Sequence, residues 1–483
     1  MKQTNNKPVR TRFAPSPTGY MHIGNLRTAL YEYLIAQSGG GKFLLRIEDT
    51  DTDRYVEGAT EVIYNTLKIA GLSHDEGPDV GGSYGPYVQS QRLDIYMKYA
   101  RELIDRGGAY ACFCSKERLA ELKMSDPHAK YDMFCRGLTK EQAQQKMKNA
   151  DPFVIRQLVP EGETTFIDEI FGSITVANSE MEDQVLMKAD GYPTYNYANV
   201  VDDHLMDITH VVRGSEYLSS AGKYTLLYHS FGWQVPVYVH LPPVMGSEGK
   251  LSKRKGDASF EDLLGQGFLP EAIVNFIALL GWSPGGEREI FTLKELSDVF
   301  SISGLSKSPS VFDIKKLAWM NGEYIKKMDA QDFFLMAEPY LKDAVKSPGV
   351  NFRELAALCQ PRVNVLNEIK ELLSFVDVLP DYDTALFANT KLKITAENSL
   401  TNLQNVLPLL RSLGNWALED IRRQLETFIQ QEGIKSGQIF WPLRTALSGK
   451  ESSPGGAPEL ALLLGRKESL RRLEVGIEKL KKS

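Results

Sequence analysis

The sequence predicts a Rossmann-type α/β domain in the amino-terminal half, with an α+β domain inserted into it, followed by a largely α-helical remainder. Three observations predict this fold class. Residues 9–60 read as strand, turn, helix and strand. Regular alternation is lost from about residue 110 and returns after about residue 206, and strand signals become rare after about residue 260. Alternating strands and helices are typical of a doubly wound sheet that binds its ligand at the carboxyl ends of the strands.

The first strand–helix–strand unit has the clearest pattern. Residues 9–13 alternate in polarity, and Pro15 and Pro17 then stop the strand. Residues 22–36 carry apolar side chains at helical spacing, and residues 43–47 are apolar almost throughout, as in a buried parallel strand. Because the chain has neither Gly-x-Gly-x-x-Gly nor a Walker A sequence, a dinucleotide site or a P-loop is disfavoured.

The rest of the chain gives shorter signals. Strands are expected at 164–167 and 208–212, and helices at 91–105, 221–231, 270–281, 353–379, 398–412, 416–432 and 458–480. The expected segments are 1–110 and 206–255 for the two halves of the α/β domain, 111–205 for the insertion, 256–326 for a first helical domain, and 327–384 and 385–483 for the two parts of a second.

Composition narrows the class of protein. The 483 residues are 42% hydrophobic and 24% charged, with a net charge of −6, as in an ordinary globular protein rather than a uniformly basic one. No apolar run approaches the ~18 residues that a membrane span needs, and the amino terminus does not resemble a signal peptide. Four cysteines are too few for a disulfide framework. We therefore expect a cytoplasmic protein without a membrane partner.

The first candidate site follows the first strand. His22 and Gly24 lie on the first turn of the expected helix, where free N–H groups and the helix dipole favour a phosphate. Gly24 leaves room for a flat ring such as adenine, and His22 can donate a hydrogen bond to a phosphate without a fixed charge. The alternative is a helix-capping loop with an incidental histidine.

The second candidate site is a basic loop between glycines. Residues 250–255 carry four cations, at Lys250, Lys253, Arg254 and Lys255. Lysines supply point charges to a phosphate chain, and a loop can bring them to the transition state. The alternative is a solvated basic loop.

Together the two sites resemble the signatures of class I aminoacyl-tRNA synthetases. His22-Ile-Gly-Asn25 corresponds to "HIGH" and Lys250-Leu-Ser-Lys-Arg254 to "KMSKS". The sequence is most similar to the bacterial glutamyl-tRNA synthetases, whose motifs also match Arg12–Gly19, Arg46–Asp51, Tyr192–His204 and Trp441–Arg444. Asn25 replaces the second histidine, as is usual in this family.

The resemblance implies a role for each matching position. Arg12 and Arg213 would clamp the side-chain carboxylate of glutamate, since a guanidinium fork suits a carboxylate. Glu48 would hold the substrate ammonium, helped by Ser16 and Ala14, with Tyr195 and Asn199 in the same pocket. ATP would bind His22, Gly24, Asn25, Lys250, Ser252 and Lys253, of which His22, Lys250 and Lys253 would be catalytic. The reaction would need Mg²⁺ with ATP and no protein nucleophile.

Three cysteines near one another have the character of metal ligands. Cys112 and Cys114 form a Cys-x-Cys pair, and Cys135 follows. Tetrahedral zinc needs four donors. Relatives that carry zinc here imply Tyr131 as the fourth ligand, and His128 is a further candidate. The alternative is three free thiols left from a lost site, while Cys359 is expected in the core.

The resemblance also implies the partners, which are tRNA(Glu), ATP and L-glutamate, with the protein as a monomer. The insertion would hold the tRNA acceptor end, and the last helical domain would read the anticodon, with Arg362 and Arg444 as candidates. Residues 465–483 carry seven Lys or Arg against three Glu, which predicts a helix with one basic face.

Five alternatives are considered at this point. A non-discriminating form would also charge tRNA(Gln), and a catalytically decayed form would only bind tRNA. A glutaminyl-tRNA synthetase would have β-barrels where this sequence predicts helices. A truncated relative that glutamylates a tRNA base, or another nucleotidyltransferase, would lack the helical half.

Overall fold

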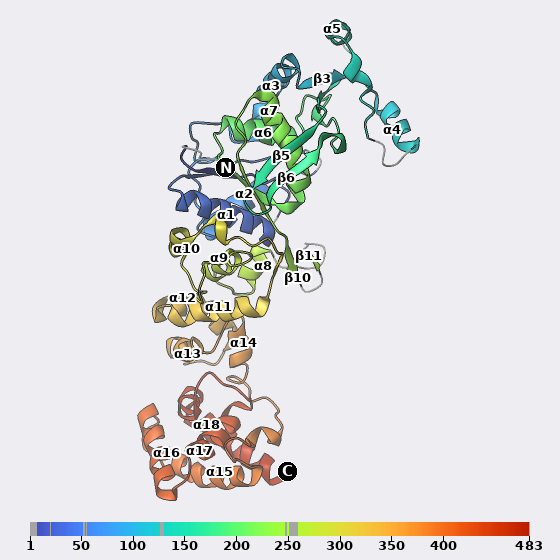
Figure 1. Cartoon of the computed structure of the whole chain (residues 1–483). Helices are drawn as coiled ribbons and strands as arrows, with labels where there is room; N and C mark the ends of the chain where they lie inside the picture. The colour runs from blue at the N-terminus through green and yellow to red at the C-terminus, as the bar shows by residue number, and fades with distance from the viewer. Residues whose placement is uncertain are drawn as a thin grey trace. The chain divides into compact units, whose positions relative to one another are not determined.

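The computed structural model describes residues 7–19, 21–51, 54, 56–125, 130–149, 151–246, 249–250 and 259–482. The chain forms two compact units. The first comprises residues 1–264 and 270–313, and the second comprises residues 265–269 and 314–483. Figure 1 labels many of their elements along the chain.

Parallel strands form the centre of the first unit. β1 (Arg10–Phe13) pairs with β2 (Lys42–Leu45), and α1 (Ile23–Ser38) connects them, as the sequence predicts. β8 (His210–Gly214) pairs in parallel with β9 (Val237–Leu241). The Thr209 amide donates to the Arg10 carbonyl at 2.9 Å, which places β1 beside the start of β8. The carboxyl ends of β1 and β8 therefore lie together, as the Rossmann-type expectation requires.

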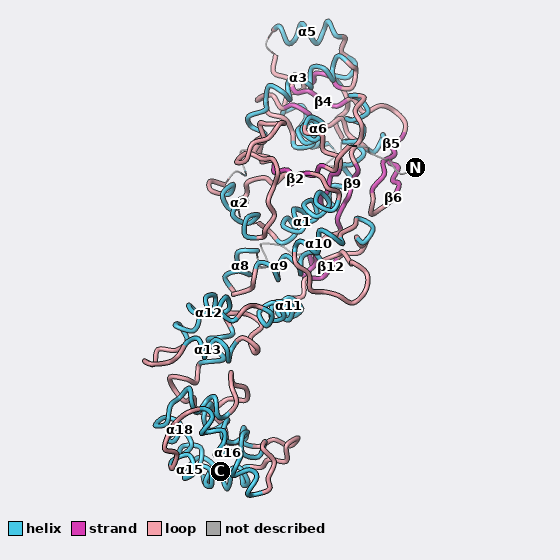
Figure 2. Tube along the Cα trace, turned by 90° about the vertical axis from the view of Figure 1, so that its left-hand side faces the viewer, coloured by secondary structure: helices cyan, strands magenta, loops and turns pink. Residues whose placement is uncertain are grey.

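The insertion is not separate from this sheet. β5 (Glu163–Asp168) and β6 (Gly172–Ala177) form a hairpin whose strands lie side by side (Figure 1, Figure 2). β5 also pairs in parallel with β9, at Asp168 and Tyr238. A hairpin from the segment 111–205 thus extends the sheet that holds β8 and β9, in the order β6-β5-β9-β8.

The remaining strands of the first unit form two separate small sheets. β3 (Ala109–Cys112), β4 (Val154–Gln157) and β7 (Val185–Met187) form an antiparallel sheet, while β10 (Val244–Gly246) pairs with β11 (Gly249–Lys250) and β12 (Ser310–Val311). The helices are α2 (Ala59–Ile69), α3 (Leu93–Asp105), α4 (Lys116–Ser125), α5 (Lys140–Lys148), α6 (Tyr195–Leu205), α7 (Ala221–Phe231), α8 (Phe260–Gly265), α9 (Pro270–Ala278) and α10 (Leu293–Val299).

The second unit is helical, as predicted, and its described residues from 314 onward contain no strand beyond an isolated bridge. Its helices are α11 (Ile314–Lys327), α12 (Ala330–Ala344), α13 (Phe352–Cys359), α14 (Glu368–Leu373), α15 (Ala396–Arg411), α16 (Leu418–Glu432), α17 (Gly437–Ser448) and α18 (Ala457–Lys482). One helix over 353–379 was a wrong prediction. The chain leaves the helix at Gln360, because Pro361 has no N–H to continue it.

The predicted basic helix at the carboxyl end exists, but one of its cations is structural. Arg472 of α18 is fully buried and donates to the carbonyls of Phe375, Val376 and Leu447 at 2.8–3.0 Å. Its Nε also donates to Glu468 at 2.7 Å. Arg472 therefore holds the fold together and does not belong to an exposed basic face.

Candidate active site

The turn after β1 ends in the cap of α1. His22 is the N-cap residue, and its Nδ1 accepts a hydrogen bond from the Gly24 amide at 3.0 Å. Because Nδ1 accepts, the neutral ring carries its proton on Nε2, the nitrogen that can donate to a phosphate. A Cβ at Gly24 would meet only the His22 ring, at 3.3 Å, so the space beside this turn is otherwise open. Asn25 follows on the exposed face.

The residue Ser259, which follows the basic loop in the sequence, contacts the same turn. Ser252 and Lys253 lie outside the described residues, and Lys250 is described only as backbone, in β11. Beyond the loop, Ser259 forms an antiparallel bridge with His22. This bridge places Ser259, five residues beyond the second motif, beside the first motif, although the two residues are more than 200 positions apart in the chain.

A cavity of about 440 Å³ lies beside this helix start. Its lining includes most of the residues that the sequence selected, namely Arg12, Ala14, Ser16, His22, Gly24, Asn25, Tyr195 and Arg213. A smaller hollow shares Ser16 and Thr18 with the cavity and is lined by Glu48. Asn199 is not among the lining residues of either, because its buried amide donates to the Tyr195 carbonyl at 2.9 Å.

The two arginines that are predicted to bind the substrate carboxylate have different hydrogen-bond partners. Arg12 donates through Nε to Asp203 at 2.8 Å and through Nη1 to Glu32 at 3.1 Å, so buried carboxylates surround it. Arg213 is also buried, but its Nη1 has no hydrogen-bond partner among the described residues. Its Nε donates to His240 Nε2 at 3.2 Å. Of these two arginines, Arg213 is therefore the one with a donor that has no partner among the described residues.

Glu48 has the matching free acceptor. Its Oε1 accepts from Arg46 Nη2 at 3.0 Å, whereas its Oε2 has no partner within the described part of the chain. Burial raises the pKa of Glu48 to about 7, despite the opposing charges of Arg46 and Arg12. A buried carboxylate oxygen without a donor is costly and is suited to receive an ammonium group.

Several buried groups in or behind the cavity were missed by the sequence analysis. Asp203 accepts from both Arg12 and Arg46, and Asp202 accepts from Arg92 Nε at 2.7 Å. Glu32, which belongs to α1, forms an ion pair with Arg12. Asp202 and Asp203 lie within a motif that matched the family, but their spacing in the sequence does not predict the arginines with which they form ion pairs.

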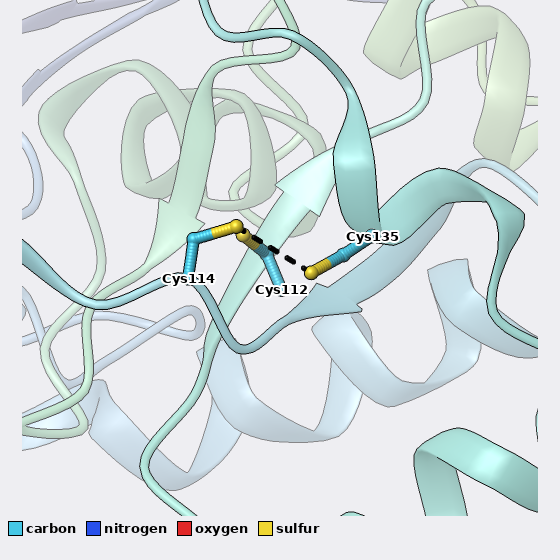
Figure 3. A group of neighbouring side chains, drawn as sticks. All are labelled: Cys112, Cys114 and Cys135. Atoms are coloured by element: carbon cyan, nitrogen blue, oxygen red, sulfur yellow. Dashed lines mark hydrogen bonds between the residues drawn. The ribbon is translucent and has the colours of Figure 1, made fainter. Parts of the chain in front are cut away.

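The three cysteines converge at the end of β3 (Figure 3). The sulfurs of Cys112, Cys114 and Cys135 all lie within 4.8 Å of one another, and Cys114 and Cys135 are 3.6 Å apart. The Tyr131 hydroxyl lies 3.2 Å from the Cys112 sulfur and 3.6 Å from that of Cys114. His128 lies outside the described residues. Cys359 is buried in α13, as predicted.

The two candidate tRNA-reading arginines belong to the second unit. Arg362 is exposed and lines a hollow together with Lys450. Arg444 of α17 is half-buried and lies 4.7 Å from the ring centre of Trp441, and it does not line that hollow.

An α/β sheet with a helix N-terminus suited to phosphate, together with the two sequence signatures, is typical of class I aminoacyl-tRNA synthetases. Residues 8–319 match the family described as "tRNA synthetases class I (E and Q), catalytic domain", and residues 332–477 match "Anticodon binding domain". The chain is therefore a member of the glutamate–tRNA ligase family, as the next comparisons show.

The similarity to individual relatives covers the whole chain. The chain is 58% identical over 482 residues to the glutamate–tRNA ligase of Clostridium novyi (strain NT), covering 99% of each chain. It is 56% identical to that of Clostridium kluyveri, covering 98% of each. The crystal structure of a glutamate–tRNA ligase from Elizabethkingia meningosepticum in complex with its amino acid is 32% identical, with a TM-score of 0.86 and coverage of 98% of this chain and 100% of that chain.

These findings confirm the predicted family, enzyme class and fold class. They disfavour the glutaminyl-tRNA synthetase and nucleotidyltransferase alternatives, because the second unit is helical and matches an anticodon domain. No helix in the described part of the chain is long and apolar enough to cross a membrane. The monomeric state and the cytoplasmic location stay predictions.

Proposed function

We propose that this ligase binds L-glutamate between Arg213 and Glu48 and transfers it to the 3′-terminal ribose of tRNA(Glu). One observation carries the proposal. A buried guanidinium nitrogen and a buried carboxylate oxygen, both without partners among the described residues, flank the hollows beside the helix start. A carboxylate at Arg213 and an ammonium at Glu48 would satisfy both atoms at once.

The chemistry then consists of positioning and charge stabilisation. The α-carboxylate of glutamate attacks the α-phosphorus of ATP, the bond to the bridging oxygen breaks, and pyrophosphate leaves. The terminal 2′-hydroxyl of tRNA then attacks the mixed anhydride and releases AMP. Mg²⁺ arrives as the ATP complex and adds positive charge at the phosphates. His22 donates from Nε2 at the α1 start, and Lys250 and Lys253 contact the phosphates where negative charge develops.

Glutamate-dependent ATP–pyrophosphate exchange, with and without tRNA(Glu), tests the proposal. Exchange that requires tRNA supports both ligation and an active site that activates glutamate only when tRNA is bound. Exchange without tRNA supports ligation alone. If folded protein shows no exchange under either condition, the proposal is overturned in favour of a decayed, tRNA-binding protein. Charging of purified tRNA(Gln) with glutamate would identify the non-discriminating form.

Lys253 is proposed to act in the transition state. We expect Lys253→Ala to lower kcat by about 10- to 100-fold while changing the KM for ATP much less, because the charge it meets develops only during reaction. Pyrophosphate exchange at varied ATP measures both constants, with Lys307→Ala as a control outside the signature. A raised KM with an unchanged kcat would show that Lys253 serves binding only.

Glu48 predicts a pH dependence of glutamate binding. Burial raises its pKa to about 7, so the free enzyme holds a proton on Glu48 below pH 7 and cannot attract the substrate ammonium. The KM for glutamate should therefore fall as pH rises towards 7, by about tenfold per pH unit, and level off above it. Glu48→Gln should have a high KM that does not vary with pH. A wild-type KM that is flat from pH 5.5 to 8 would contradict this role.

We further propose that Cys112, Cys114, Cys135 and Tyr131 hold zinc. Zinc–sulfur bonds of about 2.3 Å in a tetrahedron place sulfurs about 3.8 Å apart, close to the 3.6 Å between Cys114 and Cys135. Two cations would offset the negative charge of such a site. Arg118 Nη1 lies 3.4 Å from the Cys114 sulfur, and the Arg156 guanidinium lies 3.9 Å from the Tyr131 ring centre.

Metal analysis tests the zinc proposal. Purified protein should contain about one zinc per chain, and Cys135→Ser should lose it and lower the Tm, because structural zinc contributes to folding. Cys359→Ala, which removes a buried cysteine of the other unit, should retain the zinc. Wild-type protein with no zinc and four titratable thiols would support the alternative of a lost site.

A further inference from the structure

Arg213 is a buried cation with no ion pair in the described part of the chain. Its side chain lines the cavity. Its guanidinium lies instead over three aromatic rings, 4.3 Å from the ring centre of Tyr224 and 5.6 Å from those of Tyr217 and Tyr238. Stacking on an aromatic ring does not fix the rotation of a guanidinium group. Another group must therefore set the direction in which the N–H donors of Arg213 point.

His240 is the group that does so. It is fully buried on β9, and its Nε2 accepts from Arg213 Nε at 3.2 Å. For Nε2 to accept, the proton of the neutral ring must be on Nδ1, and Nδ1 lies 2.7 Å from Asp168 Oδ2.

Asp168 is itself fixed by the backbone. Its Oδ2 accepts from the His240 amide at 3.0 Å, and its Oδ1 accepts from the amides of Ile170 and Phe171, both at 2.9 Å. Four donors therefore surround one buried carboxylate, which keeps it an acceptor. Asp168 comes from β5, and His240 from the neighbouring β9, so the sheet pairing aligns the two.

We propose that Asp168 and His240 are positioning residues that aim Arg213 at the substrate side chain and thereby set the preference for glutamate over glutamine. The inference rests on the proposed glutamate site. A neutral histidine satisfies Nε without cancelling the charge of Arg213, which leaves Nη1 and the full positive charge for a carboxylate. A carboxylate in place of His240 would neutralise the arginine before substrate arrived. Fixing a binding group through an outer shell of hydrogen bonds is a general way to gain selectivity.

Two substitutions at His240 test whether it orients Arg213 or only contributes to the stability of the fold. His240→Leu removes the acceptor for Arg213, and His240→Gln keeps an oxygen that can accept from Nε. We expect His240→Leu to raise the KM for glutamate by about 10- to 100-fold and to reduce glutamate-over-glutamine discrimination, with kcat and the KM for ATP nearly unchanged. His240→Gln should restore most of the glutamate KM. His229→Gln, on an exposed position of α7, is the control.

The experiment distinguishes failure of the positioning role of His240 from failure of the proposed function. Loss of all exchange in wild-type protein would overturn the proposed function itself. If His240→Leu folds and keeps the wild-type KM and discrimination, or raises the KM for ATP equally, the positioning role is overturned. If the variants do not fold, ¹⁵N spectra of histidine-labelled wild-type protein decide the matter. A neutral His240 with its proton on Nδ1 supports the proposal, and a proton on Nε2 overturns it.

Discussion

Asp203→Asn is expected to lower the free energy of unfolding of the first unit by about 3–5 kcal/mol, because it removes one partner of a buried ion network. Asp203 Oδ1 accepts from Arg12 Nε and from Arg46 Nη1, both at 2.8 Å. All three side chains are buried, and the two arginines hold the pKa of Asp203 below its usual value against the effect of burial. An amide would leave two buried guanidinium groups short of negative charge.

Chemical denaturation followed by circular dichroism measures this loss. Asp343→Asn is the matched control, because Asp343 pairs with Lys370 at 2.9 Å on the exposed surface of the second unit. Exposed ion pairs contribute little, so the control should unfold at the wild-type midpoint. Equal midpoints for Asp203→Asn and wild type would show that the other carboxylates of the network compensate.

The sequence predicts elements well where local pattern and burial agree. The strand at 9–13, the helix from residue 22 and the helix at 221–231 correspond closely to β1, α1 and α7, whose apolar side chains are largely buried. The helix at 314–327 was not predicted. Its buried face contains Asn321 and Gly322, and Asn321 Oδ1 accepts from the Leu269 amide at 2.7 Å. A polar residue buried for a tertiary hydrogen bond interrupts the apolar pattern.

The sequence pointed only to residues that are proposed to meet the ligand. His22 lies in a signature motif and Arg213 follows from the family resemblance, and the structure places both at one cavity. Asp168 and His240 could not be selected, because their meeting depends on the pairing of β5 with β9 across 72 residues. Side chains that hold another side chain have no fixed spacing in the sequence, so long-range sheet register must be known first.

Arg213→Met should raise the KM for glutamate by about 100-fold or more, because truncating one partner of a buried, hydrogen-bonded charge pair costs about 2–5 kcal/mol. The side chain of methionine retains much of the apolar stem but has no donor for a carboxylate. The fold should tolerate the change, since no carboxylate in the described part of the chain depends on Arg213. Pyrophosphate exchange at varied glutamate measures the effect.

Arg12→Met provides the contrast that makes this prediction specific. Arg12 compensates Asp203 and Glu32, so its loss should destabilise the first unit as well as weaken glutamate binding. Arg213→Lys keeps the charge without the fork, and we expect a KM between those of wild type and Arg213→Met. A wild-type KM in stable Arg213→Met would mean that Arg12 alone receives the substrate carboxylate. Arg213 Nη1, which has no partner among the described residues, argues against a site that uses Arg12 alone, because a buried unpaired donor gains most from a ligand that supplies an acceptor.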